Sequence, residues 1–156
     1  MNLAIDTNIL VQAFCKWEPV HTVVTSFVTQ KLHNLCFDSE GCISKEYERN
    51  VGKSDAHRKW YKRITAVKAL YYCSGKLNQT HKTQLCQLGC HESTDHAFIA
   101  VAFNSDKHLI SEDSDVGKGP KGNQPPHCNA LKYLNDEMGI TVYDAQEASL
   151  NLGNKS

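Results

Sequence analysis

Hydrophobic positions along this chain form two kinds of pattern, short unbroken runs and longer stretches with a helical period. The short apolar runs are typical of buried strands and cover 2–6, 35–38, 108–111 and 140–143. The helical period predicts helices over 7–15, 21–32, 44–51, 55–73, 79–88, 94–104 and 128–138. Because short apolar strands alternate with helices, we predict an α/β fold with three layers, α/β/α, and a central, mainly parallel sheet.

Two of these predicted helices have unusual faces. The 94–104 helix is apolar almost all round, so it must be covered on every side. The 55–73 helix is amphipathic, and its apolar stripe, expected to face inward, consists of Trp60, Ile64, Val67 and Tyr71. Its opposite face is basic and carries Arg58, Lys59, Lys62 and Arg63.

The chain reads as one domain followed by a short tail. A length of 156 residues is enough to bury roughly two thirds of the surface of the unfolded chain. We expect the domain to span 1–148 and a flexible tail to span 149–156. The glycine- and proline-rich stretch 117–126 predicts a mobile loop.

Charge and cysteine content indicate which partners and which cellular compartment to expect. The 17 basic and 17 acidic residues balance, so net charge alone does not require a nucleic-acid partner. The seven cysteines are an odd number and lie mostly in apolar stretches, which favours unpaired, buried thiols in a reducing compartment. The chain begins without a signal-peptide pattern and has no apolar run of about 18 residues, so we expect a cytoplasmic protein that does not enter a membrane.

Acidic residues recur where predicted elements begin or end. Asp6 follows the first strand, Glu46 and Asp95 lie at the beginnings of helices, and Asp113 and Asp115 follow the 108–111 strand. In open α/β sheets, ligands bind at the carboxyl ends of the strands. Clustered carboxylates are the ligands that Mg²⁺ and Mn²⁺ prefer. Taken singly, each acid could be a helix cap, a first-turn acid, a surface acid or a turn residue; together they favour a metal site.

Four segments carry a resemblance to a known family. They are Leu3-Ala4-Ile5-Asp6-Thr7-Asn8, Ile43-Ser44-Lys45-Glu46-Tyr47, Ser93-Thr94-Asp95-His96-Ala97 and Leu109-Ile110-Ser111-Glu112-Asp113-Ser114-Asp115. In order and separation these segments resemble the acidic motifs of the PIN domain family, and the resemblance runs over nearly the whole chain. Ser111 stands where the family more often has threonine, Val116 replaces an aromatic residue, and 117–126 has no counterpart.

The resemblance implies a Mg²⁺- or Mn²⁺-dependent endoribonuclease. It implies catalytic roles for Asp6, Glu46, Asp95 and Asp113, and metal binding by Asp6, Asp95, Asp113 and Asp115. A small domain of this family is similar to the toxin of a toxin–antitoxin pair or a related defence effector. RNA, an antitoxin or regulatory protein and a second copy of the chain are the partners that it implies.

Several polar residues are candidates for supporting roles. Thr7, Asn8 and Ser111 would hold the acids in place or donate hydrogen bonds to a phosphate, although ordinary cap and turn bonds explain them equally well. The basic face of the 55–73 helix could follow a nucleic-acid backbone, or it could simply be solvated. Lys118 and Lys121, on glycine-rich backbone, are further candidates for phosphate contact.

Other functions have weaker support in the residues. A phosphatase of the haloacid dehalogenase type needs a second aspartate two residues after Asp6, where this chain has Asn8. An RNA-binding module without activity would not need all four acids. Cys86, Cys90 and His91 could bind zinc, but a second paired motif is missing.

Overall fold

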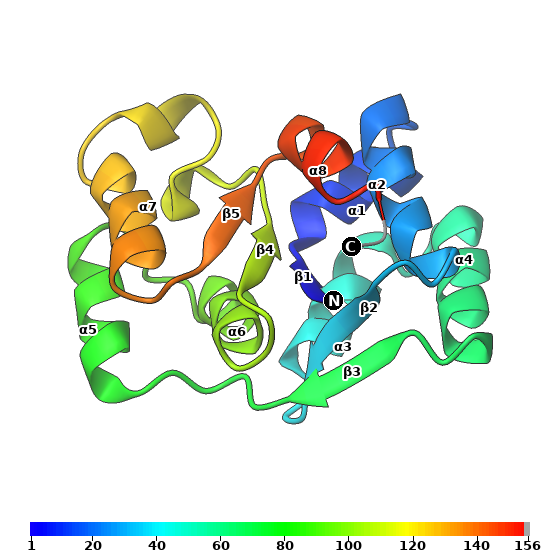
Figure 1. Ribbon diagram of the computed structural model, residues 1–156, viewed down its shortest axis with the longest axis horizontal. Coiled ribbons are helices and arrows are strands. Elements are labelled where there is room, and N and C mark those ends of the chain that lie inside the picture. The colour runs from blue at the N-terminus through cyan, green and yellow to red at the C-terminus, as the bar shows by residue number, and fades with distance from the viewer. Residues whose placement is uncertain (155–156) are drawn as a thin grey trace.

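A five-stranded sheet forms the centre of the computed structural model, which describes residues 1–154 (Figure 1). The strand order is β3-β2-β1-β4-β5, and every neighbouring pair is parallel. The strands are β1 (Asn2–Ile5), β2 (Asn34–Asp38), β3 (Leu70–Cys73), β4 (His108–Ile110) and β5 (Thr141–Tyr143). The predicted parallel sheet is therefore confirmed.

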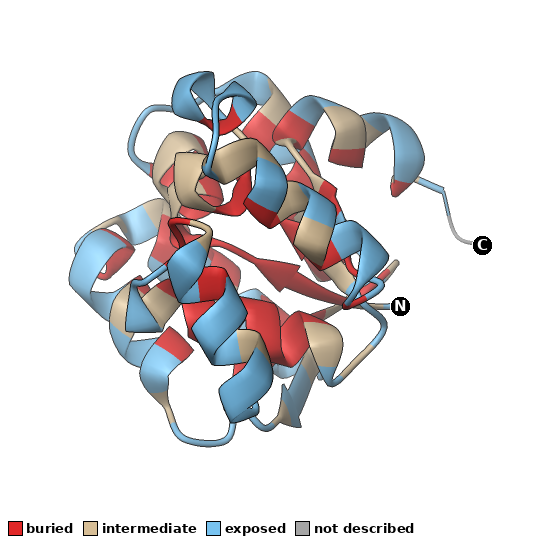
Figure 2. Ribbon diagram, turned by 90° about the vertical axis from the view of Figure 1, so that its left-hand side faces the viewer, coloured by how far each residue is buried: buried red, intermediate tan, exposed pale blue. Residues whose placement is uncertain are grey.

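Helices lie on both faces of this sheet, with the buried strands between them (Figure 2). The helices before β4 are α1 (Thr7–Phe14), α2 (Pro19–Thr29), α3 (Cys42–Val51), α4 (Asp55–Ala66), α5 (Gln79–Gln87) and α6 (Ser93–Phe103). Two 3-10 turns and two helices follow: η1 (Ser114–Val116), η2 (Pro120–Asn123), α7 (His127–Asp136) and α8 (Ala145–Asn151). The three-layer α/β/α fold predicted from the sequence is confirmed.

The α6 helix is the central element of the core. It packs against β1, β2 and β4, and every residue from Asp95 to Ala102 is buried. The expectation that this helix is covered all round is thus confirmed. Its position matters for the site because it brings the first turn of α6 to the end of β1.

The path of the chain creates a crevice at the carboxyl ends of β1 and β4. β1 pairs with β2 on one side and with β4 on the other. The chain leaves β1 towards β2 and returns much later to β4, so the order of the strands reverses between these two neighbours. Such a switch point is where open α/β sheets bind ligands.

The predicted helix over 55–73 is wrong in its last part. α4 ends at Ala66, and Lys68 has a left-handed backbone with φ of 57°. The backbone N–H of Ala69 donates to the carbonyl of Ile64 at 2.9 Å, which closes the helix. The next residues pair with β2 as the edge strand β3, so Tyr71 is 38% exposed and does not continue the inward stripe.

Two segments, expected to be a mobile loop and a flexible tail, contain helical elements. The 117–126 stretch contains η2, which packs against η1 and α7. Its Gly122 lies so close to Gly117 that a Cβ on Gly122 would be 2.5 Å from the Gly117 carbonyl carbon. The expected domain boundary at 148 falls inside α8, and Leu152 is buried. Residues 155–156 of the expected tail lie outside the described residues.

His33 joins the two ends of the described chain. Its Nδ1 lies 3.2 Å from the amino group of Met1. Its Nε2 lies 2.8 Å from the carbonyl oxygen of Leu152. Both ends therefore meet near the amino ends of the strands, on the side away from the crevice.

The cysteines are unpaired but less buried than expected. All seven are free thiols. Cys36 and Cys90 are buried, whereas Cys15, Cys42 and Cys86 are exposed. Within residues 1–154, no helix combines the length and apolar character that crossing a membrane requires.

Candidate metal centre

Three carboxylates meet in the crevice at the switch point. Asp6 directly follows β1, Asp113 lies just beyond β4, and Asp95 belongs to the first turn of α6. Each offers one oxygen, and these three oxygens lie within 4.8 Å of one another. The acids come from distant parts of the sequence, so only the packing of β1, β4 and α6 brings them together.

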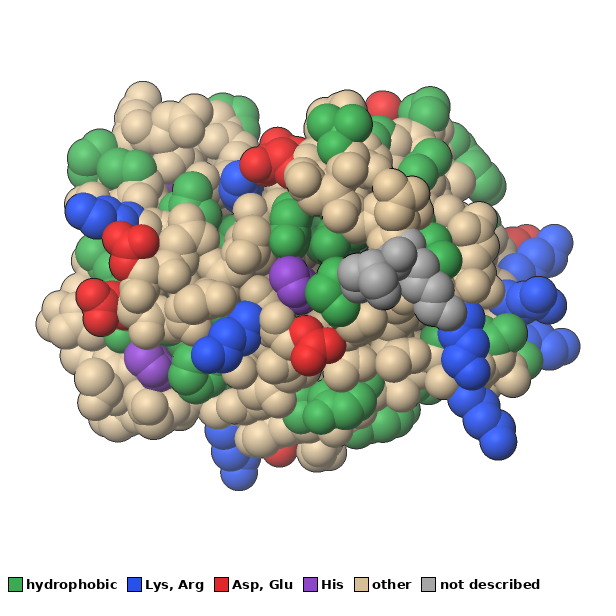
Figure 3. All heavy atoms as spheres, in the orientation of Figure 1, with side chains coloured by type: hydrophobic (Ala, Val, Ile, Leu, Met, Phe, Trp, Pro, Cys, Tyr) green, Lys and Arg blue, Asp and Glu red, His purple; other side chains and the backbone are tan. Residues whose placement is uncertain are grey.

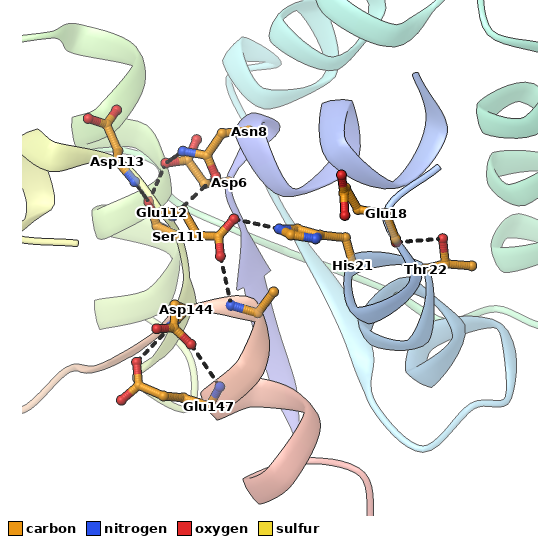
Figure 4. Close-up of polar contacts among 11 residues, drawn as sticks. Asp6, Asn8, Glu18, His21, Thr22, Ser111, Glu112, Asp113, Asp144 and Glu147 are labelled. Carbon is orange, nitrogen blue, oxygen red and sulfur yellow. Dashed lines mark hydrogen bonds and ion pairs between the residues drawn. The ribbon is translucent and has the colours of Figure 1, made fainter. Parts of the chain in front are cut away.

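Asp6 is held in place by donors on both of its oxygens. The backbone N–H of Thr7 donates to Oδ1 at 2.7 Å, and the Ser111 hydroxyl donates to Oδ2 at 2.7 Å. The Asn8 amide also reaches Oδ2 at 3.4 Å, and its own oxygen accepts from the Glu112 N–H at 3.2 Å. Figure 4 shows Asn8 and Ser111 gathered about Asp6. The predicted supporting roles of Asn8 and Ser111 thus have a geometric basis.

The loop after β4 is fixed by several local contacts. Ser111 Oγ accepts from the Asp113 N–H at 3.1 Å, and Asp113 Oδ1 accepts from the Asp115 N–H at 2.9 Å. Glu112 contacts His21 on α2 and accepts from the Ala145 N–H, the first of α8, at 3.3 Å (Figure 4). Glu112 therefore anchors this loop to two helices, a role that the sequence did not reveal.

Asp95 carries an unsatisfied oxygen. The side chain is 7% exposed, and its Oδ2 is buried without a hydrogen-bond partner. A buried carboxylate oxygen with no donor or cation is costly, and most such groups in proteins are paired. A cation among the three carboxylates would supply the missing partner.

Burial and the charges of neighbouring acids disfavour ionisation of Asp6 and Asp95. Burial, with further contributions from the charges of Asp113 and Asp6, raises the pKa of Asp95 from 3.8 to about 8. Burial also raises the pKa of Asp6 to about 6, although the Ser111 hydrogen bond opposes the change. A cation bound between these two carboxylates would favour their ionised form.

The other two predicted acids line the same cleft but stand outside this group of three. Glu46 on α3 contacts Arg49 at 3.1 Å and accepts from the Asn50 amide at 2.9 Å. A carboxylate oxygen of Asp115 lies 3.6 Å from Nδ1 of His127. Asp115 is therefore not brought together with Asp6, Asp95 and Asp113 as a fourth direct ligand, although the family resemblance implied this role.

The cleft has a volume of ≈ 360 Å³. Besides the predicted site residues, it is lined by Val11, Gln12, Asn50, Thr94, Phe98 and a further acid, Glu92, which were not predicted as site residues. Asn50 could have been predicted from the sequence, because it follows Glu46 by four residues and so lies on the same face of the helix. The others reach the cleft only through tertiary packing.

No family model, curated protein or solved structure matches this chain. The geometry of the acidic cleft is therefore the main support for a function.

The basic residues predicted to contact phosphate are not among those that line the cleft. Arg58 forms an ion pair with Asp55 at 2.6 Å, whereas Lys59, Lys62 and Arg63 are exposed on α4. Figure 3 shows basic side chains projecting from the edge of the molecule where α4 lies.

The two lysines of the 117–126 segment differ from each other. Lys118 Nζ binds Glu147 at 2.7 Å, and its side chain is only 17% exposed. Its charge is therefore already paired. Lys121 is exposed and keeps its freedom to contact a phosphate.

The cysteine–histidine alternative finds no support. Among residues 1–154, the three aspartates are the only group of His, Cys, Asp and Glu side chains close enough to share a metal ion. Cys90 is buried, while Cys86 and His91 are exposed. A zinc site at these residues is therefore not formed.

Proposed function

We propose that this protein is a metal-dependent phosphodiester hydrolase of the PIN domain type that cleaves RNA. The observation that carries the proposal is the buried, unpartnered Oδ2 of Asp95 beside Asp6 and Asp113. Most buried carboxylate oxygens in proteins have a hydrogen-bond partner, and a cation among the three acids would supply the partner that this oxygen lacks.

The chemistry of the donors fits Mg²⁺ or Mn²⁺. All three are carboxylates, and oxygen donors select hard divalent cations over zinc or copper. Asp6, Asp95 and Asp113 would hold the ion, with Glu46 and Asp115 near enough to the cleft to act through water. When bound, such an ion supplies charge stabilisation at the phosphate and a more acidic water.

Residues of the chain would perform the remaining steps. Glu46, which contacts Asn50 and Arg49, would orient a water molecule and take up its proton as the water attacks phosphorus. The bond from phosphorus to the leaving ribose oxygen would break in the same step, and that oxygen would take a proton from solvent. Thr7 Oγ1 lacks a hydrogen-bond partner and belongs to a residue that lines the cleft. Its hydroxyl would donate to a phosphate oxygen.

The biological setting follows from the family resemblance. We propose RNA as the substrate, a cytoplasmic location, and a role as the toxin of a toxin–antitoxin or defence system. An antitoxin or regulatory protein and a second copy of the chain would then be its protein partners. The phosphatase alternative is disfavoured because Asn8 braces Asp6 and the Glu112 backbone instead of supplying an acid.

Cleavage of labelled single-stranded RNA by purified protein tests the proposal. Activity should appear with Mn²⁺, vanish with EDTA and fall by roughly 100-fold or more in Asp6→Asn and Asp95→Asn, because each removes a metal ligand. Asp136→Asn, an equal charge change at an exposed position of α7, is the matched control. Wild-type cleavage by either ligand variant would refute the proposal.

A second measurement does not depend on activity. Millimolar Mn²⁺ should raise the melting temperature of the wild type and of Asp136→Asn, because the metal binds the folded site and not the unfolded chain. Asp95→Asn should lose most of this rise. A melting temperature that does not change on addition of Mn²⁺ at pH 7.5 would argue against a metal site, even if cleavage were observed.

A further inference from the structure

A second groove adjoins the acidic cleft. It lies between the end of α1 and the corner where α3 meets α4, and it has a volume of ≈ 450 Å³. Its lining includes Phe14, Trp17, Asn50, Lys53 and Ser54. We call it the Trp17 groove.

The Trp17 groove and the acidic cleft share a wall. Asn50 lines both of them. Its amide donates to the backbone carbonyl and to Oε1 of Glu46, at 2.8 and 2.9 Å, so its position is fixed relative to the acids. Asn50 therefore gives a polymer whose phosphate lies among the acids a direct path into the Trp17 groove.

Trp17 is unusual in both its exposure to solvent and its backbone conformation. Its side chain is 68% exposed, although tryptophan is among the residues that gain most from burial. Its φ is 56°, a left-handed conformation that bulky residues seldom adopt. Hydrogen bonds from the neighbouring N–H groups, Lys16 to Val11 at 3.2 Å and Glu18 to Gln12 at 3.0 Å, hold the turn on both sides. The indole is thus presented to solvent from fixed backbone.

The charge of the groove suits a polyanion. Lys53 is exposed and has no carboxylate oxygen within 4.0 Å among residues 1–154. The one acid on the groove, Asp55, is paired with Arg58 at 2.6 Å. The lining of the groove therefore contains an unpaired lysine and an exposed aromatic side chain.

The two walls are joined before any ligand arrives. The Ser54 hydroxyl donates to the carbonyl oxygen of Phe14 at 3.2 Å, which ties the start of α4 to the end of α1. Ser54 Oγ also accepts from the His57 N–H at 3.2 Å as the cap of α4. A groove held open by such bonds needs little reorganisation on binding, which favours affinity.

We propose that the Trp17 groove binds the nucleotide adjacent to the scissile phosphate of single-stranded RNA, with its base stacked on Trp17 and a phosphate on Lys53. This inference rests on the proposed nuclease function and adds to it a substrate-holding site. Stacking on an aromatic face tolerates every base, so the site would give affinity and register with little sequence preference.

Equilibrium binding of a fluorescein-labelled, random-sequence RNA 10-mer, measured by anisotropy in EDTA, tests the groove apart from cleavage. Trp17→Ala should weaken binding about tenfold, while Trp17→Phe retains most of the affinity. Lys53→Ala should reduce the slope of log affinity against log salt by about 0.7, the value for one phosphate contact on a single strand. Tyr72→Ala, another exposed aromatic residue on β3, and Lys132→Ala on α7 are matched controls.

Tryptophan fluorescence gives an independent signal. RNA should quench the wild type but not Trp17→Phe, because the remaining Trp60 is 7% exposed. Quenching that survives in Trp17→Phe would contradict the stacked base.

The outcomes separate this inference from the nuclease proposal. If wild type cleaves RNA but Trp17→Ala and Lys53→Ala bind it normally, the groove assignment is overturned and the nuclease stands. If both variants weaken binding in a protein that never cleaves, the groove stands without the nuclease. If Trp17→Ala alters the oligomeric state and leaves RNA affinity unchanged, the groove is a protein interface and the inference fails. If wild type neither binds RNA in EDTA nor cleaves it in Mn²⁺, both proposals fail.

Discussion

Asp95 opposes folding of the metal-free protein as the pH rises. Its pKa is 3.8 when unfolded and about 8 in the folded protein, so the folded state binds one more proton across that interval. By linkage, stability falls as the pH rises from about 4 to about 8 and is constant above. Asp95→Asn removes this loss.

In EDTA, we therefore expect Asp95→Asn to raise the melting temperature at pH 8 by several degrees, given roughly 2–4 °C per kcal/mol for a protein of this size. The gain should shrink towards zero at pH 4, where the aspartate is protonated in both states. A set of melting curves from pH 4 to 9, with Asp136→Asn beside it, measures this. A gain independent of pH would mean that the charge of Asp95 is not the cause.

Sequence alone identified Asp6, Asp95 and Asp113, because each stands at the end of a recognisable element. It did not identify Glu112 as the anchor of the β4 loop or Asn50 as the partner of Glu46. Glu112 reaches His21 across 91 positions of the chain, and no local pattern encodes such a contact. It also could not separate the three converging acids from Asp115, because that difference is set by distances of a few ångströms.

At the scale of elements, the boundary between α4 and β3 shows why periodicity failed. The apolar spacing of Trp60, Ile64 and Val67 continues to Tyr71 by coincidence. Lys68 reverses the chain, and pairing with β2 then decides the conformation of 70–73. A lysine carries no signal for a left-handed turn, unlike glycine.

The basic face of α4 remains a predicted RNA contact. Removing two exposed charges with Lys59→Ala and Arg63→Ala should weaken RNA binding across sequences and lower the salt slope by about 0.7 per lost contact. Metal-induced stabilisation should not change. An equal double variant on α5 and α7, Lys82→Ala with Lys132→Ala, is the control. An unchanged slope would assign the α4 face to solvent or a protein partner.

Because η2 packs against η1, we expect a substitution at Gly122 to destabilise the fold. Gly122→Ala would force a Cβ against the Gly117 backbone at 2.5 Å, and overpacking of this kind costs about 1–3 kcal/mol. Because η1 immediately follows Asp113, affinity for Mn²⁺ should fall as well. Gly41→Ala is the comparison: its φ is 86° and nothing lies within 4 Å, so it should cost only about 1–2 kcal/mol of backbone strain.

Urea unfolding with and without Mn²⁺ distinguishes these two glycines. Gly41→Ala should shift the midpoint equally in both conditions. Gly122→Ala should shift it more when Mn²⁺ is present. Equal behaviour of the two variants would show that the η1–η2 contact does not support the acids.

At the scale of the whole molecule, the layered α/β architecture was predictable because its strands and helices alternate clearly along the chain. Strand β3 was not predictable. It lies at the edge of the sheet and is half exposed, so it lacks the continuous apolar run that is typical of a buried strand. The crevice between β1 and β4 follows from the order in which the strands are connected. The prediction that the acids lie there therefore did not depend on predicting β3.

The contacts of His33 hold Met1 and Leu152 near each other, so we expect the fold to tolerate a different chain order. A short glycine–serine linker could join the two ends, and new ends could be opened between Lys76 and Leu77, in the connection from β3 to α5. We expect this circular permutant to fold and to keep its stabilisation by Mn²⁺, because the rewired joint lies at the opposite pole from the acids. A permutant opened between Gly119 and Pro120 should fold less stably and bind Mn²⁺ weakly. Loss of folding in the first permutant would show that continuity between β3 and α5 holds the domain together.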